Sequence, residues 1–133
     1  MINGVHHINL LVRNLEQAVE QYRRQLGVDS FQWDELPGRG VRMARFQAGG
    51  TWVVLVQPVA DGEPMRVLRE QGEGLFLLSF GVDSLDDAMV RVTDGGGGFI
   101  NDGPRQGLDN WRVIDLDPSC VAGAALQLTE EES

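Results

Sequence analysis

Two stretches of the chain share one order of hydrophobic and polar positions. Each begins with a short apolar run, Val5–Val12 or Leu75–Val82, that is typical of a buried strand. A small polar residue follows each run, and apolar residues then recur at helical spacing. This repetition predicts a duplicated structural module. At an offset of about 70 residues, the shared positions are Val12 and Val82, Leu15 and Leu85, and Ala18 and Ala88.

Helices are predicted where capping residues flank a stretch with helical periodicity. Asn14 and Gln17 form a capping-box pattern and Gly27 supplies a stop, so we expect a helix over 15–26. Ser84 precedes a helix expected over 85–93, and a short helix is expected around 65–71. The other apolar runs predict strands over 5–12, 29–33, 41–46, 51–57, 75–82, 99–101, 111–116 and 124–129.

The order strand, helix and three strands therefore occurs twice. This order predicts an α+β fold made of two tandem βαβββ modules. Module one covers 1–60, a connector covers 61–73 and module two covers 74–133, and together they make one domain over 1–133. A module on its own has exposed sheet edges and a poor core, so the two modules are expected to pair.

Composition narrows the classes of partner. The 133 residues carry 11 basic and 20 acidic side chains, a net charge of −9, which argues against nucleic acid or an anionic membrane surface as partner. The sequence has no apolar run of about 18 residues and no signal-peptide pattern, so we expect a cytoplasmic protein without membrane association. The single cysteine, Cys120, rules out an intramolecular disulfide and a CxxC metal site. A small organic molecule is the expected ligand.

Several ordered motifs carry a family resemblance. They are His7–Ala18 followed by Tyr22 and Leu26–Gly27, then Gly72–Leu75, then Val82–Ala88, and finally Asp117–Pro118. With these motifs the chain resembles the vicinal-oxygen-chelate (glyoxalase/bleomycin-resistance/dioxygenase) superfamily over nearly its whole length. In pattern it is most similar to the methylmalonyl-CoA epimerases. The resemblance implies a U-shaped, cupped mixed β-sheet and an edge-to-edge homodimer.

The resemblance also implies a divalent metal held in the cup by one side chain from the first and one from the last strand of each module. Those positions fall on His7, Val54, Leu77 and Gln127. Valine and leucine have no ligating atom, and imidazole with an amide oxygen is a weak pair for a divalent ion. We therefore expect a degenerate site with no metal and no cofactor.

Strand alternation places a small set of polar groups on the inward face. His7 is the candidate general acid or base because its usual pKa lies near neutrality. Gln127 and Asn9 are candidates for polarising a carbonyl, and Asp115 for a second proton transfer or for holding the tautomer of His7. The predicted catalytic residues are His7, Gln127 and Asp115, and the predicted substrate-binding residues are Asn9, Trp52, Val54, Leu77, Ser79 and Trp111.

Three functions are compatible with such a pocket. The first is a metal-independent enzyme of isomerase, epimerase or lyase type acting on a carbonyl compound, with His7 as acid or base. The second is a non-catalytic protein that sequesters an aromatic ligand, as antibiotic-resistance members of the superfamily do. The third is a metal-dependent epimerase with shifted ligands, such as His6, His7 and acidic residues from loops. His7 has an alternative interpretation as a residue that fills the pocket and hydrogen-bonds to Gln127.

Overall fold

The computed structural model describes residues 1–132, except for the side chain of Pro37. Contacts group these residues into two compact units. One unit covers 8–76, and the other combines 1–7 with the described residues from 77 onward. Strands β1 (Ile2–Leu11) and β5 (Gly74–Val82) each contribute residues to both units.

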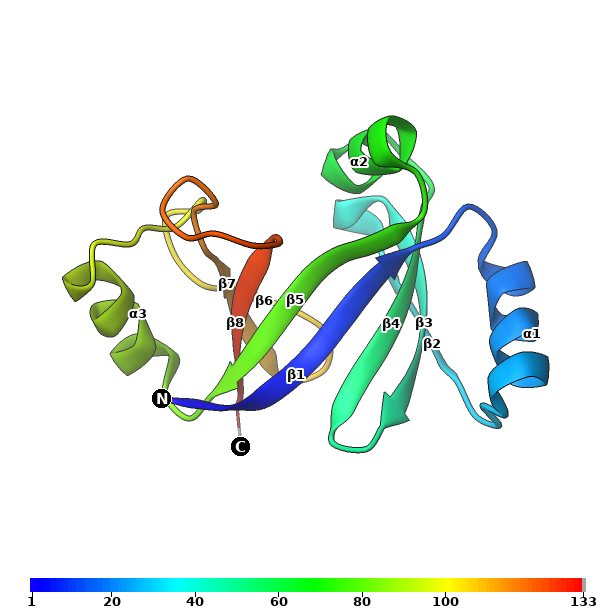
Figure 1. Cartoon of the computed structure of the whole chain (residues 1–133), viewed down its shortest axis with the longest axis horizontal. Helices are drawn as coiled ribbons and strands as arrows, with labels where there is room; N and C mark the ends of the chain where they lie inside the picture. Colours follow the sequence, from blue (N-terminus) through cyan, green and yellow to red (C-terminus); the bar gives the residue numbers. More distant parts are fainter. Residues whose placement is uncertain (133) are drawn as a thin grey trace. The chain divides into compact units, whose positions relative to one another are not determined.

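The 8–76 unit contains α1 (Leu15–Leu26), β2 (Gln32–Leu36), a short 3₁₀ turn (Pro37–Arg39), β3 (Val41–Ala48), β4 (Thr51–Pro58) and α2 (Glu63–Gln71). Its strand order is β2-β3-β4-β1, with β2, β3 and β4 joined antiparallel. Helix α1 packs against β3 and β4 (Figure 1). Asn14 caps its start and Gly27 ends it in the left-handed conformation at φ 68°, as the sequence predicts.

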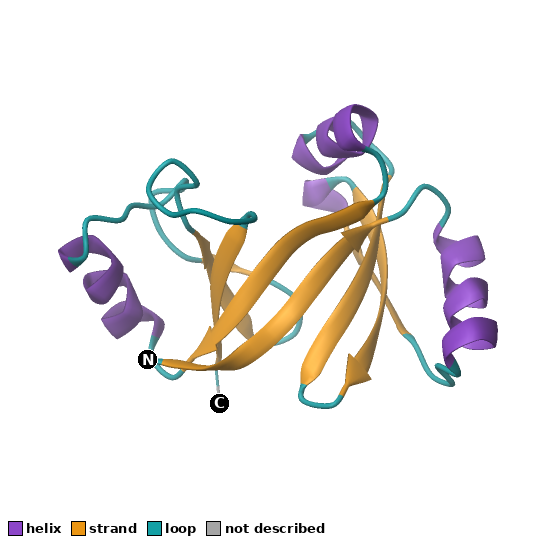
Figure 2. Ribbon diagram, in the orientation of Figure 1, coloured by secondary structure: helices purple, strands orange, loops and turns teal. Residues whose placement is uncertain are grey.

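The second unit contains the start of β1, most of β5, α3 (Leu85–Asp94), β6 (Arg105–Gln106), β7 (Trp111–Asp115) and β8 (Leu126–Glu131). Its strand order is β1-β5-β8-β7-β6, drawn with the other strands in Figure 2. Strand β8 is parallel to β5 and antiparallel to β7. The pairing Ser79 with Gln127, and Asp115 with Gln127, brings three strands together at one level of the sheet.

Each unit has its own hydrophobic core, and the two cores repeat one another. In each, a valine at a strand end and a leucine and an alanine on the following helix pack against two strands. The first core consists of Val12, Leu15, Ala18, Val19, Ala44 and Leu55, and the second of Val82, Leu85, Ala88, Ile114 and Leu128. The offset seen in the sequence therefore corresponds to equivalent packing positions.

The helix starts repeat as well. The backbone N–H of Leu15 donates to Gln57 Oε1 at 2.8 Å, and that of Leu85 donates to Glu130 Oε1 at 2.6 Å. The acceptors lie on β4 and β8, the last strand of each module. In both helices, a side chain distant in sequence therefore accepts from an N–H that has no acceptor within the helix. Arg42 binds Glu16 in the first turn of α1, and Arg112 binds Asp86 in the first turn of α3. The Arg42 hydrogen bond lowers the pKa of Glu16.

The N-caps give a direct test of the local helix signals. Asn14 Oδ1 accepts from the backbone N–H of Gln17 at 2.9 Å, and Ser84 Oγ accepts from that of Asp87 at 3.2 Å. We expect Asn14→Ala and Ser84→Ala each to lower the free energy of unfolding by about 0.5–2 kcal/mol. Urea denaturation followed by circular dichroism measures this loss. Asn14→Ser retains a capping oxygen and should keep most of the stability, whereas an equal loss would contradict the capping role.

The α+β class, the repeated βαβββ order and the three helices are confirmed for residues 1–132. Two strand predictions are wrong. The strand predicted over 29–33 lies at Gln32–Leu36, where it pairs with β3 and places Trp33 opposite Ala44. The strand predicted over 99–101 is reduced to one bridge between Phe99 and Leu116, and the short β6 forms inside the predicted loop.

Strand β6 begins directly after Pro104, which has no N–H to donate to a ladder. Before Pro104, the backbone N–H of Ile100 donates to the carbonyl of Asp115 at 3.1 Å, next to the Phe99–Leu116 bridge. Arg105 then pairs with Val113 and reaches Asp115 with its side chain. Within the described residues, none of the helices combines the length and apolar character needed to cross a membrane.

Candidate functional site

His7 lies on β1 in the second unit and is buried, with 4% of its surface exposed. Its Nδ1 atom lies 2.8 Å from Nδ1 of His6. Nε2 of His6 in turn lies 2.7 Å from Oε1 of Glu131 on β8. The sequence prediction placed His6 on the opposite face of the strand, so this three-residue chain was missed.

Gly81 of β5 lies close to the start of β1. A Cβ at Gly81 of β5 would collide with Asn3 Oδ1 and would lie 3.7 Å from the Cβ of His6. Glycine at position 81 therefore leaves room for the side chain of Asn3. Asn3 also donates from Nδ2 to Asp83 Oδ1 at 2.8 Å, which ties the start of β1 to the end of β5.

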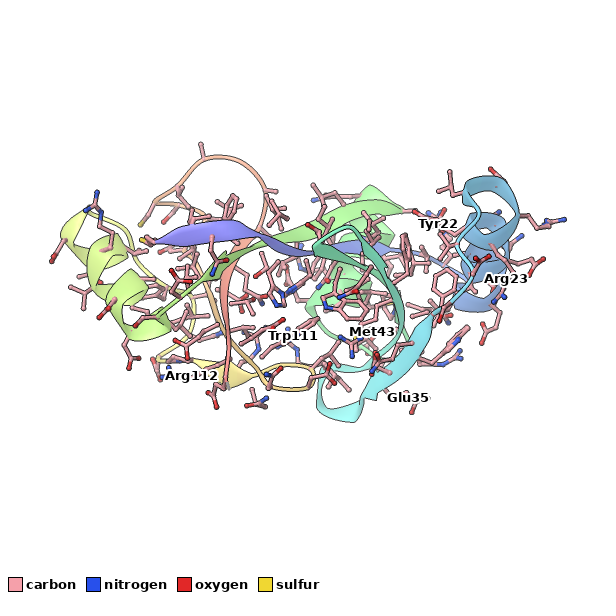
Figure 3. All side chains as sticks on the ribbon, turned by 90° about the horizontal axis from the view of Figure 1, so that it is seen from below. Tyr22, Arg23, Glu35, Met43, Trp111 and Arg112 are labelled. Atoms are coloured by element: carbon pink, nitrogen blue, oxygen red, sulfur yellow. The ribbon has the colours of Figure 1, made fainter. Side chains whose placement is uncertain are left out.

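Trp111 packs against both imidazole rings. It lies at the start of β7, is 4% exposed, and is labelled in Figure 3. The ring of His7 stacks on it at 4.8 Å between centroids and 16° between planes. The ring of His6 meets it edge-on at 4.6 Å. The predicted role of Trp111 as a surface for substrate stays a prediction, and in this structure one of its faces is covered by His7.

A second hydrogen-bonded chain crosses β5, β8 and β7 in the same unit. Ser79 Oγ lies 2.5 Å from Thr129 Oγ1, which lies 3.4 Å from Gln127 Oε1. Gln127 Nε2 donates to Asp115 Oδ1 at 3.0 Å. Because a carboxylate only accepts hydrogen bonds, Asp115 fixes which end of the Gln127 amide faces it. The predicted residues Ser79, Gln127 and Asp115 are therefore brought together.

Arg105 completes this chain and was not among the predicted site residues. Its guanidinium forms an ion pair with Asp115 Oδ2, and Asn101 Nδ2 donates to the same oxygen at 3.3 Å. Asp115 therefore contacts Arg105 and Asn101 through one oxygen and orients Gln127 through the other. The sequence signal that could have found Arg105 is weak, because the residue lies in a stretch that reads as loop.

Three predicted substrate-binding residues, Asn9, Trp52 and Val54, lie in the 8–76 unit. Val54 is buried in β4, and the guanidinium of Arg45 lies 4.4 Å from the ring centroid of Trp52. Arg45 is fully buried and bonds Asp34 through Nε at 2.9 Å. A cavity of about 590 Å³ lies beside Arg45 and Trp52, and residues 26–32, 46 and 47 complete its lining.

The four positions at which the resemblance implies metal ligands do not fit a divalent ion. Val54 and Leu77 are buried hydrocarbon side chains without a donor atom. Gln127 uses its amide nitrogen on Asp115, and an amide oxygen is a poor substitute for a carboxylate ligand. Among residues 1–132, no group of three or more histidine, cysteine, aspartate or glutamate side chains could hold a metal ion. The donor set therefore disagrees with the metal that the superfamily implies.

Relatives and solved structures agree on the fold. The chain is 26% identical over 133 residues to an ethylmalonyl-CoA/methylmalonyl-CoA epimerase of Cereibacter sphaeroides, covering 98% of this chain and 99% of the relative. The structure of methylmalonyl-CoA epimerase from Mycobacterium tuberculosis superposes with a TM-score of 0.92 at 23% identity, covering 99% of this chain and 90% of that one. A methylmalonyl-CoA epimerase in complex with methylmalonyl-CoA and NH4+ superposes with a TM-score of 0.89 at 24% identity, covering 100% and 97%.

The likeness to these solved structures concerns the fold. The sequence itself also matches a family model, over residues 6–114. That segment includes His7, both module helices and most of β7, which are the elements that carry the repeat and part of the site. The chain therefore belongs to the glyoxalase/bleomycin resistance protein/dioxygenase superfamily.

Proposed function

We propose that the chain is an enzyme of isomerase or epimerase type that removes and returns the proton on the carbon next to a thioester carbonyl, without a metal. The observation that carries the proposal is the buried His7, which contacts His6 and through it Glu131, while two of the four implied metal-ligand positions hold hydrocarbon. The epimerase relatives support an acyl-CoA thioester as the substrate class.

In this proposal His7 takes the proton from the α-carbon, and the electron pair of the broken C–H bond moves onto the carbonyl oxygen as an enolate. The enolate oxygen then needs a hydrogen-bond donor in place of a metal. Gln127 has two amide hydrogens and uses one on Asp115, so the other can serve the enolate. Return of the proton by His7 to the same face of the α-carbon restores the base and gives exchange with retention. Inversion requires that the opposite face of the enolate receive its proton from water or from a second acid.

Sequestration of an aromatic ligand is the less favoured function. That function needs exposed flat rings, yet His7 stacks on Trp111 and Arg45 lies over Trp52. Both tryptophans therefore already pack against side chains of the chain itself. A homodimer and a cytoplasmic location remain predictions from the sequence and the resemblance.

Proton exchange in D2O tests the proposal without requiring that the natural substrate be known. Methylmalonyl-CoA, ethylmalonyl-CoA and unbranched acyl-CoA thioesters are incubated with the protein, and α-deuterium is counted by mass spectrometry. We expect at least one thioester to gain α-deuterium well above the rate without protein. Binding of a thioester with no exchange in any of them would instead favour the sequestering function.

A further inference from the structure

We propose that Glu131 and His6 are positioning residues that hold His7 in the neutral tautomer with its proton on Nδ1. In that tautomer Nε2 carries the basic lone pair. The inference deepens the proposed function, since it names the groups that orient its base. Its structural part concerns the placement of one proton and stands without any substrate.

The geometry forms a continuous chain. Glu131 Oε1 and His6 Nε2 are 2.7 Å apart, and the Nδ1 atoms of His6 and His7 are 2.8 Å apart. Both distances lie within the normal hydrogen-bond range. Trp111 packs against both imidazoles, so the rings are held in place as well as bonded. The side chain of His6 is 11% exposed, which limits competition by water for its nitrogens.

The proton positions follow from what each group can do. An ionised carboxylate only accepts, so Glu131 requires a proton on Nε2 of His6. A neutral imidazole has one N–H, so Nδ1 of that ring carries none and must accept. The donor to it is then Nδ1 of His7, and this leaves Nε2 of His7 as the basic nitrogen. The Glu131 carboxylate thus determines, through the ring of His6, which nitrogen of His7 carries the proton.

This effect on the tautomer outweighs a direct effect of charge. The side chain of Glu131 is 52% exposed, so water and salt screen its field at the second ring. Solvent does not screen the direction of the hydrogen bonds, because that direction is set by the direct contacts of Glu131 with His6 and of His6 with His7. The arrangement also accommodates the product of proton abstraction. After Nε2 of His7 gains a proton, its Nδ1–H can continue to donate to His6.

Nitrogen NMR of the full-length ¹⁵N-labelled protein reads the tautomer directly. The chain has two histidines, so variants with one histidine assign both rings. Spectra are recorded near pH 8.5, about two units above the usual histidine pKa. We expect His7 in the wild-type protein to carry its proton on Nδ1. In Glu131→Gln the new amide can offer an N–H as well as an oxygen, so the His7 resonances should shift toward a mixture of tautomers.

Glu132→Gln is the matched control, because it removes the same charge one residue along the chain and should leave the His7 tautomer unchanged. Thermal melting checks that all variants are folded. A wild-type His7 protonated on Nε2, or an identical His7 spectrum in Glu131→Gln, would overturn the inference. In the exchange assay we expect Glu131→Gln to be about 10- to 100-fold slower, by analogy with the loss seen when partners that orient metal-binding histidines are replaced.

The two proposals fail separately. If no thioester exchanges its α-proton but the tautomer is as described, the proposed function is wrong and the positioning chain stands. If exchange requires His7 but its proton is on Nε2, the positioning chain is wrong and the proposed function stands.

Discussion

Replacing His7 with glutamine is expected to slow α-proton exchange by about 10²–10⁴-fold, the usual contribution of a positioned general base. Glutamine is polar and of similar length, but its amide has no basic nitrogen. It should therefore keep a contact with His6 while removing the proton acceptor. The measurement is the initial rate of α-deuterium incorporation into the best thioester, at equal concentrations of folded protein.

The other histidine provides a graded comparison. His6→Gln should reduce the rate much less than His7→Gln, because His6 acts through His7 and does not itself accept the substrate proton. Equal losses in the two variants, or full exchange by His7→Gln, would show that the base has been misassigned. Circular dichroism separates such results from a loss of folding.

Leu15→Ala and Leu85→Ala are each expected to lower the free energy of unfolding by about 2–5 kcal/mol. Both leucines are 0% exposed, and each is the first residue of its helix, packed into the core of its unit. Truncation removes buried hydrocarbon and leaves a cavity that the rigid neighbouring strands cannot close. Chemical denaturation measures the loss for each variant.

Val90→Ala is the control on the same helix as Leu85. Its side chain is 60% exposed, and alanine has the higher helix propensity, so the change should stay within about 0.5 kcal/mol. If Leu85→Ala were no more harmful than Val90→Ala, the assignment of the repeated leucines to equivalent core positions would be wrong.

The parts of the fold that follow from local rules were predictable from the sequence. Asn14 and Ser84 give both helix starts, and the spacing of Leu15 and Leu85 gives both buried faces. His7 was identified because strand alternation places it on the inward face, where the resemblance implies a metal ligand, and because the usual pKa of histidine lies near neutrality. These signals act within a few residues of one another, so no tertiary information is needed to read them.

The rest of the site depends on contacts that the sequence does not contain. The contact of His6 with Glu131 joins residues 125 positions apart in the sequence. Strand alternation assigns neighbouring residues to opposite faces and does not show that the side chains of His6 and His7 reach one another. The contact of Arg105 with Asp115 was missed for a related reason, since the register of a two-residue strand is set by its neighbour β7.

The most direct test is the α-proton exchange rate of protein stripped with a chelator, with metal content determined on the same sample. We expect metal-free protein to keep its full rate and added divalent ions not to raise it. Exchange that disappears with the metal and returns when cobalt, manganese or zinc is restored would contradict it.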